Sequence, residues 1–160
     1  MSPERRPYVE KELEDDVEIA ARSRVPVLIT APPDRALRIA RDITSRAAQG
    51  GPAGSGALQV CDTAAGDDVV AALTENQPHG SMGGGTTTFL LKEVHLLTET
   101  EQGAMMKLFE TRRSRPVDEM PRIIATSSVS LFDRVQQGSF DAKLFHRLNV
   151  IHIVVVPIVP

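Results

Sequence analysis

The sequence predicts an α/β fold in which one domain is built on a five-stranded parallel sheet. Short apolar runs rich in β-branched residues alternate along the chain with longer segments whose apolar residues recur at helical spacing. The short runs are mostly apolar and do not alternate apolar and polar residues at every second position, which is typical of strands buried on both faces. This alternation indicates a parallel sheet with helices packed on both of its sides.

Length and composition limit the classes of function. The 160 residues suffice for one compact core, and a net charge of -3 gives no strong field for nucleic acid or an anionic membrane. The one cysteine, Cys61, excludes an internal disulfide and a cysteine-based zinc site. The histidines have no metal-ligand spacing. We therefore expect a cytoplasmic single domain over residues 1–160, with residues 1–8 as a flexible tail, no metal, and neither membrane nor nucleic acid as partner.

Five segments have the composition of buried strands. Each is a short run dominated by Val, Ile, Leu and Thr, residue types that fit a pleated, packed surface. In chain order they are residues 25–30, 57–61, 87–91, 122–126 and 150–155. Pro26 is compatible with the first of these strands because it lies near its start.

Helical spacing of apolar residues marks the segments between these strands. In chain order the predicted helices are residues 9–22, 36–46, 67–75, 98–115, 131–135 and 141–147. The fourth begins with a capping box, in which Thr98 is the N-cap and Glu101 reaches back to it. Asp67 and Asp68 are interpreted as helix caps and not as catalytic carboxylates. Residues 31–34, with two prolines, are a predicted turn, and the glycine-rich residues 50–56 and 77–86 are predicted loops.

Three of these segments carry strings that resemble motifs of one family. Residues 139–151 read S-F-D-A-K-L-F-H-R-L-N-V-I, similar to the string F-R-x-D-L-[YF]-[YH]-R-L-N-V. Residues 122–126 with Leu131 resemble the sensor strand R-I-I-A-A-T-N-x-x-L, and residues 88–94 resemble the Walker B strand T-L-F-L-D-E-V. These motifs belong to the AAA+ core of bacterial enhancer-binding proteins, ATPases that activate the sigma-54 form of RNA polymerase. The resemblance implies a three-layer α/β/α P-loop NTPase fold.

The phosphate-binding loop of this family is degenerate here. A Walker A loop needs glycines whose amides wrap the phosphates and a lysine that reaches the β and γ oxygens. The equivalent residues 31–36 read A-P-P-D-R-A, with no glycine or lysine and with two prolines that lack an N–H. Any remaining nucleotide contact would fall on Asp34, Arg35 and Ala36. Because Asp34 is negative, we expect phosphate binding there to be weak at best.

The Walker B position has reversed its charge. Lys92 replaces the aspartate that helps to hold Mg²⁺ in the family, while Glu93 retains the carboxylate that activates the attacking water. At roughly 4 Å and an effective dielectric of about 20, one pair of unit charges is worth on the order of 4 kcal/mol, so an ammonium group strongly disfavours a divalent cation there. A second interpretation stays open, in which Lys92 and Glu93 are a salt-bridged strand end.

Further family positions have also changed. The sensor asparagine falls at Ser127 or Ser128, and the first of two trans-acting arginines falls at Asp141, whereas the second matches Arg147. The aromatic loop G-A-F-T-G-A, through which the family engages the sigma factor, is replaced by residues 79–85. The family continues beyond the position of Pro160 into a helical lid, so the resemblance implies an α/β core that lacks this lid.

These departures favour a catalytically inactive AAA+-like module that regulates through protein contacts, without a cofactor. The partner would be a related AAA+ subunit or a regulatory protein, and the contact surface would include Phe140, Asp141 and Arg147. The alternative is an ATP-binding or ATP-hydrolysing AAA+ domain with an atypical phosphate loop, in which Arg35 or Lys92 neutralises phosphate directly. Whether the protein is an enzyme is left open by the sequence.

Overall fold

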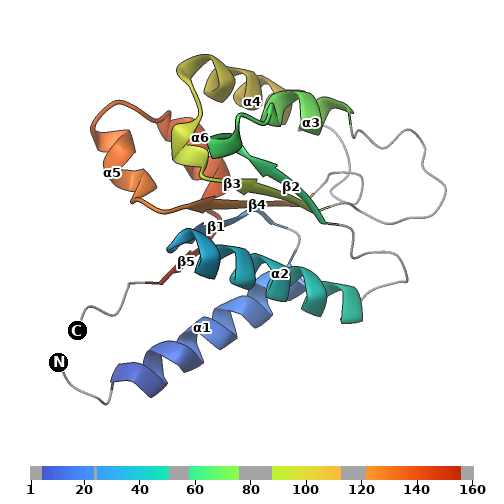
Figure 1. The fold of residues 1–160 in the computed structure, drawn as a ribbon, viewed down its shortest axis with the longest axis vertical. Coiled ribbons are helices and arrows are strands. Elements are labelled where there is room, and N and C mark those ends of the chain that lie inside the picture. The colour runs from blue at the N-terminus through green and yellow to red at the C-terminus, as the bar shows by residue number, and fades with distance from the viewer. Residues whose placement is uncertain (1–4, 24, 51–57, 76–87, 113–121, 156–160) are drawn as a thin grey trace.

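The computed structural model describes residues 5–23, 25–50, 58–75, 88–112 and 122–155, and within them it contains the predicted five-stranded parallel sheet (Figure 1). The strand order is β2-β3-β4-β1-β5. The strands are β1 (Val27–Thr30), β2 (Leu58–Asp62), β3 (Thr88–Lys92), β4 (Arg122–Ser127) and β5 (Ile151–Val154). In the register of the sheet, Leu90 of β3 lies opposite Ile124 of β4, and Leu28 of β1 lies opposite Ala125. The α/β class and the parallel sheet are confirmed.

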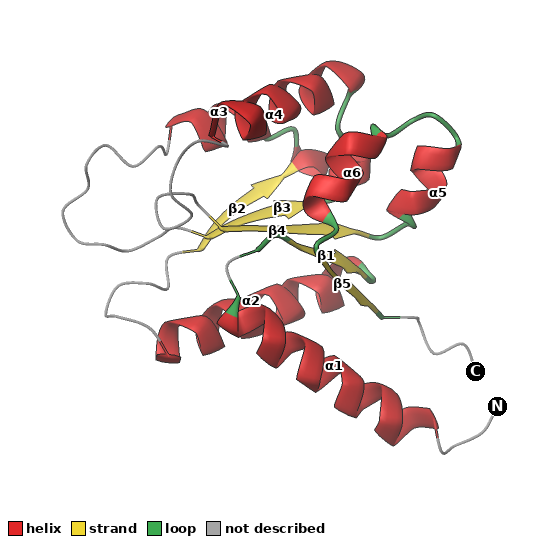
Figure 2. Ribbon diagram, turned by 180° about the vertical axis from the view of Figure 1, so that it is seen from behind, coloured by secondary structure: helices red, strands yellow, loops and turns green. Residues whose placement is uncertain are grey.

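Helices cover both faces of the sheet and give three layers (Figure 2). The α-helices are α1 (Arg5–Arg22), α2 (Pro33–Gly50), α3 (Val69–Glu75), α4 (Glu99–Arg112), α5 (Leu131–Gln136) and α6 (Ala142–Leu148). Helices α1 and α2 lie on one face, and α3, α4 and α6 lie on the other. Two short 3₁₀ helices, η1 (Thr63–Ala65) and η2 (Val94–Leu96), directly follow β2 and β3 and were not predicted.

The sheet separates two apolar cores, because its side chains alternate between the two faces. On the face of α1 and α2 the core includes Ile29, Ile43 and Ile124. On the opposite face it includes Phe89, Met105 and Leu144. Burial of these side chains on both sides explains why the inner strands β1, β3 and β4 are largely apolar, whereas the edge strands β2 and β5 are more exposed.

Polar contacts hold α1 in its place against α2 and β4. The guanidinium group of Arg46 lies 3.0 Å from Asp42, 3.2 Å from Glu18 and 3.5 Å from Glu14, and so links the two helices. The buried guanidinium group of Arg122 on β4 donates a hydrogen bond to the Ala20 carbonyl in the last turn of α1. A cation at that helix end also suits the helix dipole.

The N-terminal boundary differs from the predicted one. Helix α1 begins at Arg5, whereas a flexible tail was expected through residue 8. Pro7 falls in the first turn of the helix, where backbone N–H groups have no intrahelical acceptor, so a proline without an N–H costs no hydrogen bond there. Residues 1–4 and the predicted glycine-rich loops at 51–56 and 77–86 lie outside the described residues. Among the helices that the structure describes, none is long and apolar enough to cross a membrane.

Candidate functional site

The connection from β1 to α2 occupies the place of the phosphate loop. Two residues, Ala31 and Pro32, separate Thr30 from the start of α2 at Pro33. Pro33 is therefore the first helical residue, a position at which proline is favoured because its fixed φ is already helical. The predicted turn over residues 31–34 is thus shorter than expected, and its second half belongs to the helix.

The backbone donors of this connection are mostly in use. The Ala31 N–H donates to the Ser127 carbonyl on β4 at 3.1 Å, and the Ala36 N–H donates to the Pro32 carbonyl at 2.9 Å. The side chain of Ala36 is 1% exposed and packs in the core. Of the candidate phosphate contacts, Asp34 and Arg35 remain exposed. The amides of Asp34 and Arg35, which lie beside the Asp34 carboxylate, make a poor binding site for a polyanion.

At the end of β3, Lys92 is engaged by a carboxylate of the neighbouring strand. Its Nζ lies 3.6 Å from Oδ2 of Asp62, with the two side chains 23% and 30% exposed. The Thr63 hydroxyl lies 2.7 Å from the Lys92 carbonyl oxygen and also approaches the Glu93 carbonyl oxygen. Lys92 is thus salt-bridged, as the second interpretation expected, but to Asp62 and not to Glu93.

Glu93 has an unusual backbone conformation. Its φ of 57° and ψ of 52° are left-handed, and it is the one non-glycine residue with positive φ among those the structure describes. Such a conformation stores about 1–3 kcal/mol of strain and persists where surrounding contacts determine it. Two contacts from β4 and its following loop do so, because the Glu93 N–H donates to the Thr126 hydroxyl at 3.3 Å and the Ser128 hydroxyl donates to the Glu93 carboxylate at 2.8 Å.

The two sensor-like serines face different partners. Ser128 is exposed and contacts Glu93, whereas Ser127 is fully buried and its Oγ lies 3.1 Å from Nδ1 of His95. His95 Nε2 in turn lies 3.6 Å from Oε2 of Glu93. Burial lowers the pKa of His95, the Glu93 carboxylate raises it, and the Arg134 guanidinium lowers it. The structure thus brings together Lys92, Glu93, Ser127 and Ser128 in one polar cluster.

The predicted contact residues after α5 have divergent environments. Asp141 is the N-cap of α6, and its Oδ1 accepts the amides of Lys143 at 2.8 Å and Leu144 at 3.0 Å. Phe140 is 4% exposed and belongs to the core, so it is not available as an exposed contact residue. Its large apolar ring is better buried than hydrated, which the family string alone does not indicate. Arg147 is half-buried near the end of α6.

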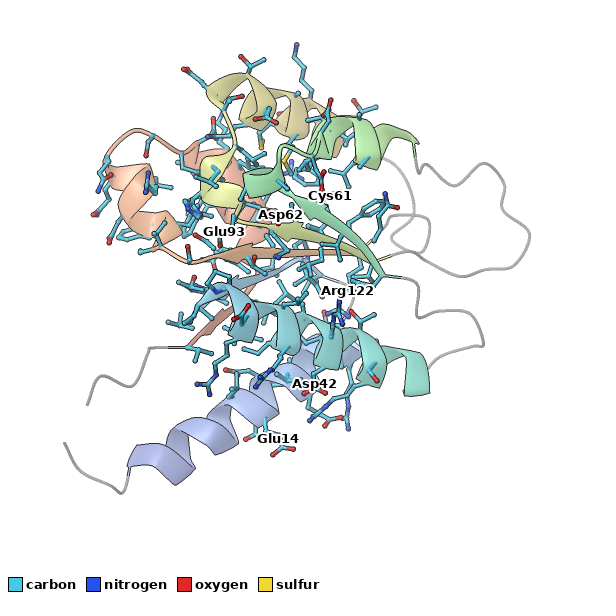
Figure 3. All side chains as sticks on the ribbon, viewed as in Figure 1. Glu14, Asp42, Cys61, Asp62, Glu93 and Arg122 are labelled. Carbon is cyan, nitrogen blue, oxygen red and sulfur yellow. The ribbon has the colours of Figure 1, made fainter. Side chains whose placement is uncertain are left out.

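Three further residues belong to the site and were not predicted. Asp62, Thr63 and His95 contribute to the polar cluster because each follows or ends a parallel strand at the same edge of the sheet. Figure 3 shows Asp62 and Glu93 at that edge. Their position directly after predicted strands was the available signal, since ligands of α/β sheets bind beyond the carboxyl ends of the strands.

Metal and thiol chemistry find no support in this arrangement. Among the described residues no cluster of three or more His, Cys, Asp or Glu side chains is placed to hold a metal ion. Cys61 is buried, and both its burial and the nearby Asp67 raise the pKa of its thiol, which disfavours the reactive thiolate. At the strand ends, Lys92 pairs with Asp62, and Glu93 accepts a hydrogen bond from Ser128.

Comparison with solved structures defines the fold class. NtrX from Brucella abortus, solved in complex with ATP, matches with a TM-score of 0.65 and 20% identity over 92% of this chain and 36% of that chain. The P-loop NTPase domain of a sigma-54 transport activator from E. coli matches with a TM-score of 0.62 and 14% identity, covering 96% of this chain and 99% of that one. At these identities the likeness shows the fold, which is that of a P-loop NTPase domain of the AAA+ type.

The sequence comparisons identify the family within that class. The model of the sigma-54 interaction domain matches residues 74–154, about half of the chain. The nitrogen fixation protein AnfA from Azotobacter vinelandii is 36% identical over 93 residues, which is 54% of this chain and 17% of that protein. The chain belongs to the sigma-54 interaction domain family, and it spans less than a fifth of the length of this curated relative.

Proposed function

We propose that this domain is a catalytically inactive member of the sigma-54 interaction family that acts in transcription regulation through protein contacts. The observation that carries the proposal is the connection between β1 and α2. It consists of Ala31 and Pro32, its one amide is already bonded to Ser127, and the helix begins with Pro33. A loop of this length cannot wrap a triphosphate with backbone amides.

The state of Lys92 supports the same conclusion. Its ammonium group and the Asp62 carboxylate form an ion pair where the family has a metal-binding carboxylate. A magnesium ion at this position would meet a fixed positive charge and would have to compete for Asp62. Glu93 remains, but a general base without a bound phosphate and metal has no substrate to activate.

Calorimetric titration with ATP and with ADP, each with and without Mg²⁺, tests the loss of nucleotide binding. We expect no binding at millimolar nucleotide. The variant Lys92→Asp should also fail to bind, because the short β1–α2 connection is unchanged. Binding of the parent domain that Mg²⁺ tightens would overturn the proposal, and binding by Lys92→Asp alone would show that charge and not loop length is the limiting defect.

The alternative of a working ATPase is favoured by the retained Glu93, which the Ser128 hydroxyl orients at 2.8 Å. In that case Arg35, exposed in the first turn of α2, would neutralise phosphate. A steady-state ATPase assay distinguishes the two functions. Turnover above background that disappears in Glu93→Gln would establish the enzyme, whereas equal background rates in parent and variant would support the inactive module.

For the contact surface we propose the exposed side of α6 around Asp141 and Arg147, with a related sigma-54 activator subunit as partner. The segment retains the family string at Phe140 and over residues 144–150, although Asp141 stands where the family has an arginine. The test mixes this domain with an active sigma-54 activator ATPase domain and follows sedimentation and ATPase rate. We expect Arg147→Ala to remove the effect on both and the neighbouring Lys143→Ala to preserve it. An effect that survives Arg147→Ala would exclude this surface.

A further inference from the structure

The hydrogen bonds around Ser127 determine where His95 carries its proton. The Ser127 hydroxyl has one proton, and the Val129 carbonyl oxygen lies 2.6 Å from Ser127 Oγ and accepts it. The Oγ lone pairs are then acceptors for the Val129 N–H at 3.3 Å and for Nδ1 of His95 at 3.1 Å. With the Ser127 proton donated to the Val129 carbonyl, the neutral imidazole of His95 donates to Ser127 from Nδ1, which leaves a lone pair on Nε2.

This lone pair is directed at a carboxylate. Nε2 of His95 lies 3.6 Å from Oε2 of Glu93, and the two side chains are 7% and 14% exposed. Two acceptors that face each other with little solvent between them repel, and the distance is longer than a hydrogen bond. A proton on Nε2 converts this contact into a charge-assisted interaction, for which distances below 3 Å are typical.

We propose that Glu93 and His95 form a proton-binding pair, and that a proton taken up on Nε2 of His95 ties the end of β3 to β4 through Ser127. The inference goes beyond the proposed regulatory function and does not depend on it. The left-handed backbone of Glu93 supports it, because such a strained residue is held in place by its contacts and responds when one of them changes.

Three groups from the surrounding elements set the acidity of the pair. Glu93, at the end of β3, attracts a proton to His95 and raises its pKa; Arg134, on α5, repels it and lowers the pKa, as burial also does. On β4, Ser127 contributes a neutral hydroxyl. Because the lowering effects dominate, the pKa of His95 lies below its ordinary value, and His95 takes up this proton on acidification.

The two states differ in how Glu93 is held. Without the proton, the Glu93 carboxylate has its hydrogen bond from the exposed Ser128 hydroxyl and an unfavourable contact with His95. With the proton, Oε2 accepts from both sides, and the ends of β3 and β4 are joined through Glu93, His95 and Ser127. Acidification thus strengthens the local link, although protonating a buried imidazole opposes folding of the whole domain.

Nitrogen-15 NMR of the intact domain, labelled at histidine, tests the pair. Variant His95→Gln assigns the signal. We expect the Nδ1–H tautomer of His95 at neutral pH, and we expect Glu93→Gln to move the His95 titration midpoint to lower pH. The matched control Glu110→Gln, on the exposed side of α4, should leave the midpoint unchanged. A neutral Nε2–H tautomer would overturn the proposal, as would an unchanged midpoint in Glu93→Gln.

A second variant tests the hydrogen bond between Ser127 and His95 separately from the charge of Glu93. Ser127→Ala removes the acceptor for Nδ1–H, so we expect the neutral tautomer to shift toward Nε2–H, which can then donate to Glu93. If the tautomer in Ser127→Ala is identical to that of the parent, the Ser127 hydroxyl does not orient the ring and the proposed link to β4 is wrong. Amide spectra of each variant show whether it remains folded.

Discussion

Two polar regions of this domain contrast in what their hydrogen bonds accomplish. At the end of β3, Lys92 pairs with Asp62, and the Glu93 carboxylate accepts a hydrogen bond from Ser128. At the start of α4, the side chain of Gln102 is buried and joins that helix to the segment before α6. Both regions correspond to family motifs. The first has Lys92 where the family has an aspartate, whereas the second includes the start of the family-like string at residues 139–151.

The difference indicates which parts of a nucleotide-binding fold depend on the nucleotide. A carboxylate that holds a metal has no structural use without it, and a neighbouring ammonium group can replace the ion as a charge partner. A buried amide has no such freedom, because an unsatisfied donor or acceptor in the core costs about 1–3 kcal/mol. The packing region is therefore expected to tolerate substitution far less than the strand ends.

The largest effect is expected for Gln102→Leu. The Gln102 amide nitrogen donates to the carbonyls of Leu97 at 2.9 Å and Ser139 at 3.3 Å, and its oxygen accepts the Asp141 N–H at 2.7 Å. Loss of these bonds leaves buried partners unsatisfied, and we expect a decrease of about 3 kcal/mol in the free energy of unfolding, measured by urea denaturation. The exposed control Gln136→Leu should change it by less than about 0.5 kcal/mol. Similar losses in both variants would contradict the proposed role.

A smaller effect is expected for Lys92→Met at the strand ends. The ion pair with Asp62 is partly exposed, so its removal should lower the free energy of unfolding by about 1 kcal/mol. A double-mutant cycle with Asp62→Asn isolates the pair, and Lys107→Met on the exposed side of α4 is the control. A coupling energy near zero would show that Lys92 and Asp62 are neighbours without a stabilising interaction.

The pH dependence of the free energy of unfolding should differ between variants of the buried His95 and variants of surface residues. The folded state lowers the pKa of His95 below its ordinary value, so the folded domain binds fewer protons than the unfolded chain on acidification. The stability that His95 contributes is present above about pH 6.5 and is lost as the pH falls below it, by at most about 1.4 kcal/mol per pH unit. Urea denaturation at several pH values should show that His95→Gln loses less of its free energy of unfolding on acidification than the parent does. The variant Gln136→Leu should lose as much as the parent. If His95→Gln loses as much stability on acidification as the parent, His95 does not cause the loss.

The smallest effect is expected between α1 and α2. Arg46 contacts Asp42, Glu18 and Glu14 on the surface, where ion pairs are weak and screened by salt. Arg46→Met should lower the melting temperature slightly at low salt, and the difference should vanish in 1 M NaCl, where screening is strong. Arg38→Met, an exposed arginine of the same helix, is the control. A difference that persists at high salt would indicate packing of the Arg46 stem instead.

Local signals in the sequence predicted most of the fold. The apolar runs located all five strands to within a few residues, and the capping box was confirmed by reciprocal hydrogen bonds between Thr98 and Glu101 at 2.9 and 3.1 Å. Asp68 caps α3 through the Ala71 amide, as expected, whereas Asp67 accepts the Asp62 N–H instead. Helical spacing and capping boxes involve residues only a few positions apart, so they can be recognised from one short segment of sequence.

The site was less predictable because its contacts are remote in sequence. Lys92 and Glu93 were identified, but their partners Asp62 and Ser128 lie 30 and 35 residues away. Neither the left-handed backbone of Glu93 nor the burial of Phe140 has a local signature. The proline pair was interpreted as a turn, although Pro33 begins α2, since proline favours both a turn and the first position of a helix. Only the assembled sheet distinguishes these possibilities.

The short connection from Thr30 to Pro33 limits how a phosphate loop could form in this domain. If nucleotide binding has been lost as proposed, a phosphate loop here would require inserted residues or the unwinding of the first turn of α2. We therefore expect no single substitution in this chain to create nucleotide binding.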